Sequence, residues 1–127
     1  MIDNIKILLY DAAKRAAEVT YSPYSKFPVG AAILTSCEQI FTGTNIENAS
    51  YGLTICAERI ALGNAISAGY KGIKAIAIYA PVMTAPPCGA CRQFIIEFGN
   101  DIEVVFRYKG EIIVKTIGEL LPYKFEF

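Results

Sequence analysis

Three of the four cysteines lie in two short stretches that could together hold a metal ion. Cys88 and Cys91 are three residues apart in PPCGACRQF, and Cys56 lies earlier, in TICAERIA; the chain contains no histidine. Two cysteines one helical turn apart share a face and supply half of a tetrahedral site. Three protein ligands with an open fourth position are typical of catalytic zinc, and sulfur favours zinc over magnesium or calcium. The spacing therefore predicts a catalytic zinc site.

The negative charge of such a site must be partly offset by neighbouring groups. Three thiolates leave a Zn²⁺ centre with a net charge of −1, which opposes the water activation that neutral histidine ligands permit. Thiolates are stabilised at helix N-termini, where the helix dipole favours negative charge. Arg59 follows Cys56 by one turn and is the expected further donor, with Arg92 as a second candidate. We expect Arg59 to hydrogen-bond to one or more of the sulfurs and to balance their charge.

Proton transfer is assigned to Glu58, which lies two residues after Cys56. A carboxylate beside a metal can take a proton from bound water and deliver it to a nitrogen. The alternative is a first-turn acid that only interacts favourably with the helix dipole. The neighbouring cysteines favour the catalytic interpretation.

Two other interpretations of the cysteines remain open. The CGAC motif of Cys88 and Cys91 has the C-x-x-C layout of thiol–disulfide redox proteins, which would give Cys56 and Glu58 no role. A closed, non-enzymatic zinc site with Cys37 as the fourth ligand is the other. Cys37 lies in a predicted hairpin turn without a partner at suitable spacing, which favours a bystander thiol.

Three helices and five strands are expected to position these residues. The hydrophobic periodicity and the turn residues predict helices over 3–19, 54–68 and 88–98, with Thr54 as an N-cap and Gly69 just past the end of the second helix. They predict strands over 29–35, 39–46, 73–80, 102–107 and 111–117, with turns at 36–38 and at Lys109–Gly110.

This order predicts an α/β fold. The strand–helix–strand crossover in the middle requires a parallel pair, and the hairpins require antiparallel pairs. We therefore expect one domain over residues 1–127, a three-layer α-β-α sandwich around a five-stranded mixed sheet. Ligands in such folds bind where helix N-termini meet the carboxyl ends of strands, and both cysteine segments fall there.

Composition restricts the partners. The twelve basic and twelve acidic residues cancel, which argues against a polymeric nucleic acid and favours a small substrate. The apolar content of 54% predicts that some surface is buried between copies of the chain. The sequence shows no signal-peptide pattern and no apolar stretch long enough to span a bilayer, so we expect a cytoplasmic protein without membrane contact.

Five motifs together resemble the small, tetrameric cytidine deaminases over nearly the whole chain: CAER, PCGACRQ, PYSKFPVGAA, TGTNIENASY and ELLP. The resemblance implies one zinc ion per subunit, held by Cys56, Cys88 and Cys91. It implies a zinc-activated water that attacks C4 of cytosine, while Glu58 accepts its proton, protonates N3 and later protonates the leaving amine. Cytidine and 2′-deoxycytidine would be converted to uridine and 2′-deoxyuridine with release of ammonia, as in pyrimidine salvage.

The resemblance also implies a set of substrate contacts. Asn45 and Glu47 match a pair that hydrogen-bonds the sugar 3′-hydroxyl, although both could be ordinary polar caps at a strand end. Phe27 matches an aromatic residue that packs along the nucleoside, although it could be core. Ala57 matches a residue whose backbone groups contact the base. Three residues match positions that reach a neighbouring subunit's site, namely Ala49, Tyr51 and Phe125, with Phe127 as an alternative to Phe125. A sister deaminase acting on another cytosine-containing nucleoside, or on a base in RNA or DNA, is the remaining alternative.

Overall fold

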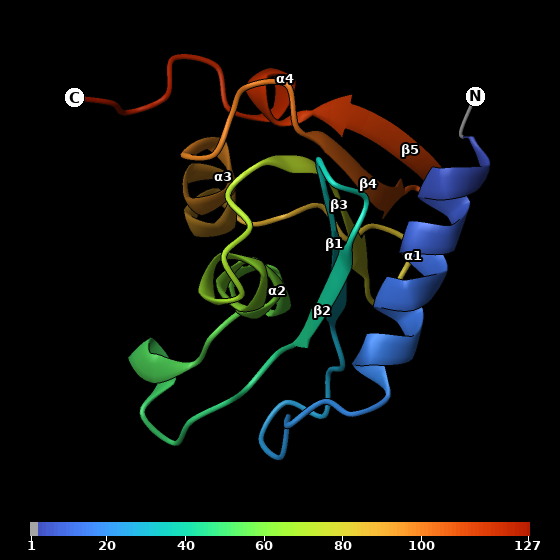
Figure 1. Cartoon of the computed structure of the whole chain (residues 1–127). Helices are drawn as coiled ribbons and strands as arrows, with labels where there is room; N and C mark the ends of the chain where they lie inside the picture. Colours follow the sequence, from blue (N-terminus) through green and yellow to red (C-terminus); the bar gives the residue numbers. More distant parts are fainter. Residues whose placement is uncertain (1–2) are drawn as a thin grey trace.

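The computed structural model describes residues 3–127, which form a central sheet with helices on both faces (Figure 1). The helices are α1 (Asn4–Ala17), the 3-10 helix η1 (Tyr51–Leu53), α2 (Ala57–Ser67), α3 (Gly89–Ile96) and the short α4 (Ile117–Leu120). The strands are β1 (Gly30–Thr35), β2 (Ile40–Thr44), β3 (Ile73–Tyr79), β4 (Glu103–Tyr108) and β5 (Glu111–Thr116). Within residues 3–127, no helix is both long and apolar enough to cross a membrane.

The sheet has the order β2-β1-β3-β4-β5. β3 and β4 are parallel, and the other neighbouring strands are antiparallel. The parallel pair is the one joined through α3, because a strand that re-enters the sheet in the same direction needs a crossover connection. The predicted five-stranded mixed sheet is therefore confirmed.

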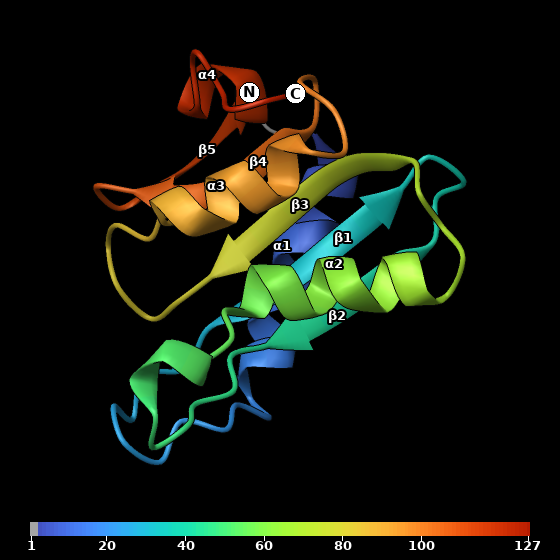
Figure 2. The same ribbon diagram turned by 90° about the vertical axis from the view of Figure 1, so that its left-hand side faces the viewer.

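Alternate residues of the central strands supply two separate cores. On β1, Ala31 and Ile33 pack towards α2 and α3, whereas Ala32 and Leu34 pack towards α1. Successive side chains of a strand point to opposite faces, so a strand that is apolar at every position is buried on both sides. Figure 2 shows the result, with α2 and α3 on the near face of the sheet and α1 behind it. This is the predicted three-layer α-β-α sandwich.

Two glycines allow helices to lie directly against strands. A Cβ atom added at Gly30 of β1 would lie 1.9 Å from the carbonyl oxygen of Ala13 in α1. A Cβ atom added at Gly43 of β2 would lie 2.4 Å from the backbone nitrogen of Ala61 in α2. The helix backbones thus approach the sheet more closely than any side chain would permit.

Two details of the predicted elements are wrong or missing. Thr54 is not the N-cap of α2, because the chain stays extended through Ile55, which pairs with Ile46 in an isolated bridge. Cys56 is the N-cap instead, and the Thr54 hydroxyl accepts a hydrogen bond from the backbone of Asn48 over 3.1 Å. The short helices η1 and α4 were not predicted. Gly69 follows α2 with φ of +97°, as expected of a residue that ends a helix.

Candidate metal centre and active site

The metal-ligating residues are presented by the starts of two helices. Cys56 is the N-cap of α2 and Cys88 is the N-cap of α3, while Cys91 lies in the first turn of α3. Neither N-cap side chain makes a capping hydrogen bond, so both sulfurs are free to face the metal position. Figure 2 shows α2 and α3 both beginning at the end of the sheet towards which β3 points.

The three sulfurs fit one zinc ion. Their Sγ atoms all lie within 4.8 Å of one another. Zinc–sulfur bonds of about 2.3 Å place tetrahedral sulfur ligands roughly 3.8 Å apart, so a small contraction brings all three to bonding distance. Among residues 3–127, Cys56, Cys88 and Cys91 are the one such group of potential ligands. Cys37 lies elsewhere, exposed in the turn after β1, so the closed four-cysteine site is not formed.

Arg59 contacts the sulfur cluster directly. Its Nη2 donates to Cys56 Sγ over 3.7 Å. The Cys91 thiol and the Arg59 guanidinium both stabilise the Cys56 thiolate and lower the pKa of Cys56 to about 5. Donation to Cys56, together with burial, raises the pKa of Cys91 above its ordinary value. Contact with the Cys56 thiolate likewise raises the pKa of Arg59.

Arg92 points elsewhere. Its Nε donates to the carbonyl of Pro87 over 2.8 Å and its Nη1 donates to the carbonyl of Leu120 over 2.9 Å. This guanidinium thus joins the residue before Cys88 to the end of α4. It fixes the position of a ligand segment and does not serve as the second sulfur donor that the sequence suggested.

Glu58 lies in the first turn of α2 and faces a cavity beside the cysteines. Its side chain is only 5% exposed, and burial raises the pKa of its carboxyl, with a further rise from the nearby Cys56 thiolate. The cavity has a volume of about 360 Å³, within the range of small-ligand sites, and Cys56 and Cys88 also line it. A buried carboxyl, two metal-ligating sulfurs and space for a small molecule thus share one enclosure.

Three of the expected substrate contacts line this cavity, namely Phe27, Asn45 and Ala57. Phe27 is 40% exposed, so it is a cavity wall and not a core residue. Ala57 is fully buried at the first helical position of α2.

Asn45 is held by three hydrogen bonds at the base of this wall. Its Oδ1 accepts from the Thr20 hydroxyl at 2.5 Å and the Val29 backbone at 3.1 Å. Its Nδ2 donates to the Phe27 carbonyl at 2.8 Å. The side-chain amide therefore retains one N–H that is not used by residues 3–127.

Glu47 lines a smaller adjoining hollow of about 140 Å³, which shares Thr54 with the main cavity. Its Oε1 accepts from the backbone of Tyr24 at 2.9 Å and of Ser25 at 3.1 Å, and its Oε2 accepts from the Ser25 hydroxyl. These hydrogen bonds from Ser25 and Tyr24 lower the pKa of the Glu47 carboxyl.

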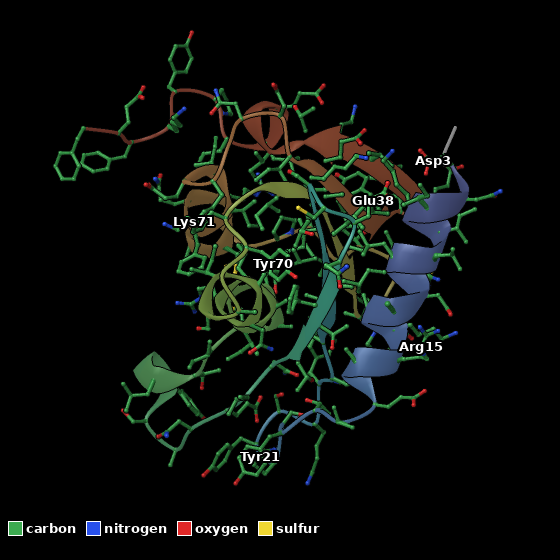
Figure 3. All side chains as sticks on the ribbon, in the orientation of Figure 1. Asp3, Arg15, Tyr21, Glu38, Tyr70 and Lys71 are labelled. Atoms are coloured by element: carbon green, nitrogen blue, oxygen red, sulfur yellow. The ribbon has the colours of Figure 1, made fainter. Side chains whose placement is uncertain are left out.

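The chain after α1 supports both Asn45 and Glu47. The backbone of Tyr21, labelled in Figure 3, donates to the Asn45 carbonyl and accepts from the Glu47 amide. Ser25, Asn45 and Glu47 lie in the quoted motifs, but the sequence offered no signal for these pairings, because the partners are far apart in the chain.

The remaining expected contacts do not reach the cavity. Tyr51 lines the smaller hollow and is 79% exposed, and Ala49 is exposed beside it. Phe125 lies in the C-terminal tail, where its carbonyl accepts from Gln93 Nε2 of α3 at 3.1 Å and its ring contacts the ring of Phe127. Neither of these two phenylalanines lines its own chain's cavity.

Sequence and structure comparisons identify the class. Residues 4–107 match the family described as the cytidine and deoxycytidylate deaminase zinc-binding region. A cytidine deaminase of Sporosarcina psychrophila is 47% identical over 116 residues, which cover 89% of this chain and 85% of that protein. A probable cytidine deaminase of Dictyostelium discoideum is 56% identical over 97 residues; these cover 75% of this chain and 65% of that protein. The crystal structure of a cytidine deaminase from Burkholderia pseudomallei aligns with a TM-score of 0.90 at 46% identity, covering 98% of this chain and all of that one.

The fold and the sulfur cluster define a zinc-binding deaminase domain. The chain belongs to the cytidine and deoxycytidylate deaminase family, as its motifs indicated. The cysteines accordingly form a zinc site, and the redox interpretation of Cys88 and Cys91 is wrong.

Proposed function

We propose that this chain is a zinc-dependent hydrolase that deaminates cytidine and 2′-deoxycytidine to uridine and 2′-deoxyuridine with release of ammonia. The observation that carries the proposal is the shared cavity of Glu58, Cys56 and Cys88 in a chain of the deaminase family. We also propose that residues 1–127 form one domain, which contains all of these groups.

Proton transfer in this reaction is carried out by residues of the chain. Zinc, when held by Cys56, Cys88 and Cys91, supplies the Lewis acidity that makes water a nucleophile near neutral pH. Glu58 takes a proton from the attacking water as its oxygen bonds to C4, and delivers that proton to N3. Glu58 then takes the remaining proton from the oxygen bonded to C4 and delivers it to the departing amine. The C4–N4 bond breaks as the C4 carbonyl forms, and ammonia leaves. The raised pKa that burial gives Glu58 suits a group that must both accept and donate.

The sugar-binding role of Asn45 and Glu47 is supported by their remaining hydrogen-bonding capacity. Asn45 retains one N–H donor, and Glu47 Oε2, which accepts from Ser25 alone, retains acceptor capacity. A hydroxyl group both accepts and donates, so it matches one donor and one acceptor. We propose that the 3′-hydroxyl of the nucleoside is this group, that Phe27 packs along the nucleoside and that Ala57 offers its backbone to the base.

A nucleoside is favoured over a nucleotide. Among the described residues, those that line the cavity include no lysine and no arginine. A phosphate group would thus enter an enclosure whose ionisable groups are a carboxyl and thiols, without a cation to offset its charge.

We further propose a cytoplasmic homotetramer that acts in pyrimidine salvage. The exposed rings of Phe125 and Tyr51, with Ala49 beside Tyr51, support this proposal, because they are accessible to a neighbouring copy. The tetramer would account for the apolar content of the chain, since contacts between subunits bury apolar surface.

The decisive experiment compares the wild type with Glu58→Gln in an ultraviolet assay of cytidine conversion, with zinc content measured on both. Glutamine keeps the shape of the side chain but cannot accept and return a proton. We expect equal zinc content and a loss of turnover of about 10³-fold or more, since general acid–base groups contribute 10²–10⁴-fold.

Two results would contradict the proposal. Turnover retained by Glu58→Gln would remove the role given to this residue. A wild-type protein that binds zinc but converts another cytosine-containing nucleoside in preference to both cytidine and 2′-deoxycytidine would point to a sister deaminase.

A further inference from the structure

One wall of the substrate cavity is a segment without regular structure between β3 and α3. Val82, Thr84, Ala85 and Pro86 of this segment all line the cavity. The segment has no helical or sheet hydrogen bonds of its own, so its position depends on what it contacts. It also leads directly into the zinc ligand Cys88.

The segment is tied to the β4–β5 hairpin by three hydrogen bonds. The Ala85 amide donates to the Arg107 carbonyl over 2.9 Å, and the Gly110 amide donates to the Met83 carbonyl over 2.9 Å. The Lys109 amide donates to the Thr84 hydroxyl oxygen, also over 2.9 Å. Thr84 is thus both a cavity-lining residue and the acceptor for the tip of a hairpin.

The hairpin tip has a conformation suited to this contact. Lys109 and Gly110 have φ of +49° and +86°, so both lie in the left-handed region used by tight two-residue hairpins. This geometry turns their amides outward towards Met83 and Thr84. A Cβ atom added at Gly110 would be strained at this φ and would lie 2.7 Å from Cε of Met83.

We infer that Thr84 is a positioning residue for the substrate: its hydrogen bond to the β4–β5 hairpin fixes the cavity wall formed by Val82–Pro86. The inference rests on the proposed nucleoside deaminase activity and adds the β4–β5 hairpin, which lies outside the zinc-binding motifs, to the determinants of substrate binding.

The test compares Thr84→Val with Thr84→Ser and the wild type. Valine keeps the shape of threonine and removes the acceptor, whereas serine keeps the acceptor. We expect Thr84→Val to raise the KM for cytidine about threefold to tenfold, the range of a single hydrogen bond, with kcat changed less than about twofold and zinc content unchanged. Thr84→Ser should restore the wild-type KM.

Two further variants make the comparison specific. Gly110→Ala perturbs the same contact from the hairpin side and should raise KM in the same direction. Thr42→Val makes the same chemical change on an exposed position of β2 outside the cavity and should leave KM unchanged. Hydrogen–deuterium exchange of a peptide spanning residues 82–86 should be faster in Thr84→Val and Gly110→Ala than in the wild type.

The outcomes distinguish a failure of the proposed deaminase activity from a failure of the positioning role of Thr84. An inactive wild type would contradict the proposed function, and the exchange measurement would still test the contact with the hairpin. An active wild type whose Thr84→Val variant has an unchanged KM would overturn the positioning role, whether or not exchange increases. A KM that rises equally in Thr84→Ser and Thr84→Val would also overturn it, because the hydroxyl acceptor would then be irrelevant.

Discussion

Arg59 and Cys56 contact each other one turn apart at the start of α2, and this contact bears on the charge balance of the zinc site. Three thiolates overcompensate a divalent ion, and excess negative charge on the sulfurs opposes the acidity of a water molecule at the metal. The guanidinium donates to Cys56 Sγ over 3.7 Å, and we propose that it withdraws part of this charge. The Cys91 thiol and this guanidinium together lower the pKa of Cys56.

Arg59→Ala is therefore expected to impair the enzyme without removing a ligand. Groups that hydrogen-bond to metal ligands typically contribute 10–100-fold to affinity or activity, and we expect a fall in kcat of about that size. Arg59→Lys should retain part of the activity because it keeps the charge but loses the planar donor fork. Steady-state kinetics and zinc competition with a chromophoric chelator measure both effects. Full activity and full zinc affinity in Arg59→Ala would refute the charge argument.

Sequence reasoning at the residue scale worked best where chemistry is local. The spacing of Cys88 and Cys91 indicates a metal site, and the position of Glu58 near Cys56 indicates a proton-transfer group. The internal hydrogen bonds of Asn45 were not predictable, because their donors come from segments that only the folded chain brings together. Arg92 was a second candidate for a sulfur donor, yet it donates to two backbone carbonyls elsewhere.

At the scale of elements, α2 carries Cys56 and Glu58, and its placement depends on the missing side chain of Gly43. Gly43→Ala would push a methyl group to within 2.4 Å of the Ala61 nitrogen and 2.8 Å of the Ala57 carbonyl oxygen. Because both atoms are backbone, neither can move alone, and we expect the free energy of unfolding to fall by about 2–4 kcal/mol. Urea denaturation followed by circular dichroism measures this change.

Gly63 offers the matched control on the same helix. A Cβ atom added there has no neighbour within 4 Å, so Gly63→Ala should raise the free energy of unfolding by roughly 0.5–1 kcal/mol through helix propensity. Equal effects of the two substitutions would contradict the close approach of α2 to β2.

The order and type of the main elements followed from periodicity, whereas the start of α2 did not. A threonine before an apolar helical pattern is a good local N-cap signal. The bridge between Ile46 and Ile55 holds the chain extended past Thr54 and delays the helix to Cys56. Tertiary pairing thus overrode the local preference for Thr54 as the N-cap. It places Cys56, a metal ligand, at the N-cap position instead.

At the scale of the whole molecule, zinc joins the starts of α2 and α3. Removal of the ion with a strong chelator should destabilise the fold. A ligand present at a thousand times its Kd contributes about 4 kcal/mol, which corresponds to a fall in Tm of roughly 15 °C for a chain of this size. Calorimetry with and without chelator measures the shift.

Cys37→Ser is the control for this experiment. Cys37 is exposed and lies outside the sulfur cluster, so the variant should bind zinc and melt like the wild type. A chelator that leaves Tm unchanged would show that the three cysteines do not hold a structural link between the helices.

The C-terminal tail extends the consequences beyond one copy of the chain. The Phe125 carbonyl accepts from Gln93 of α3, whereas the rings of Phe125 and Phe127 contact each other and are exposed; neither ring lines the cavity of its own chain. Any contact that these rings make with a substrate must therefore occur in the cavity of another copy. Specific activity would then fall on dilution, as copies separate, and a mixture of a tail-deficient chain with an active-site variant would recover turnover that neither has alone.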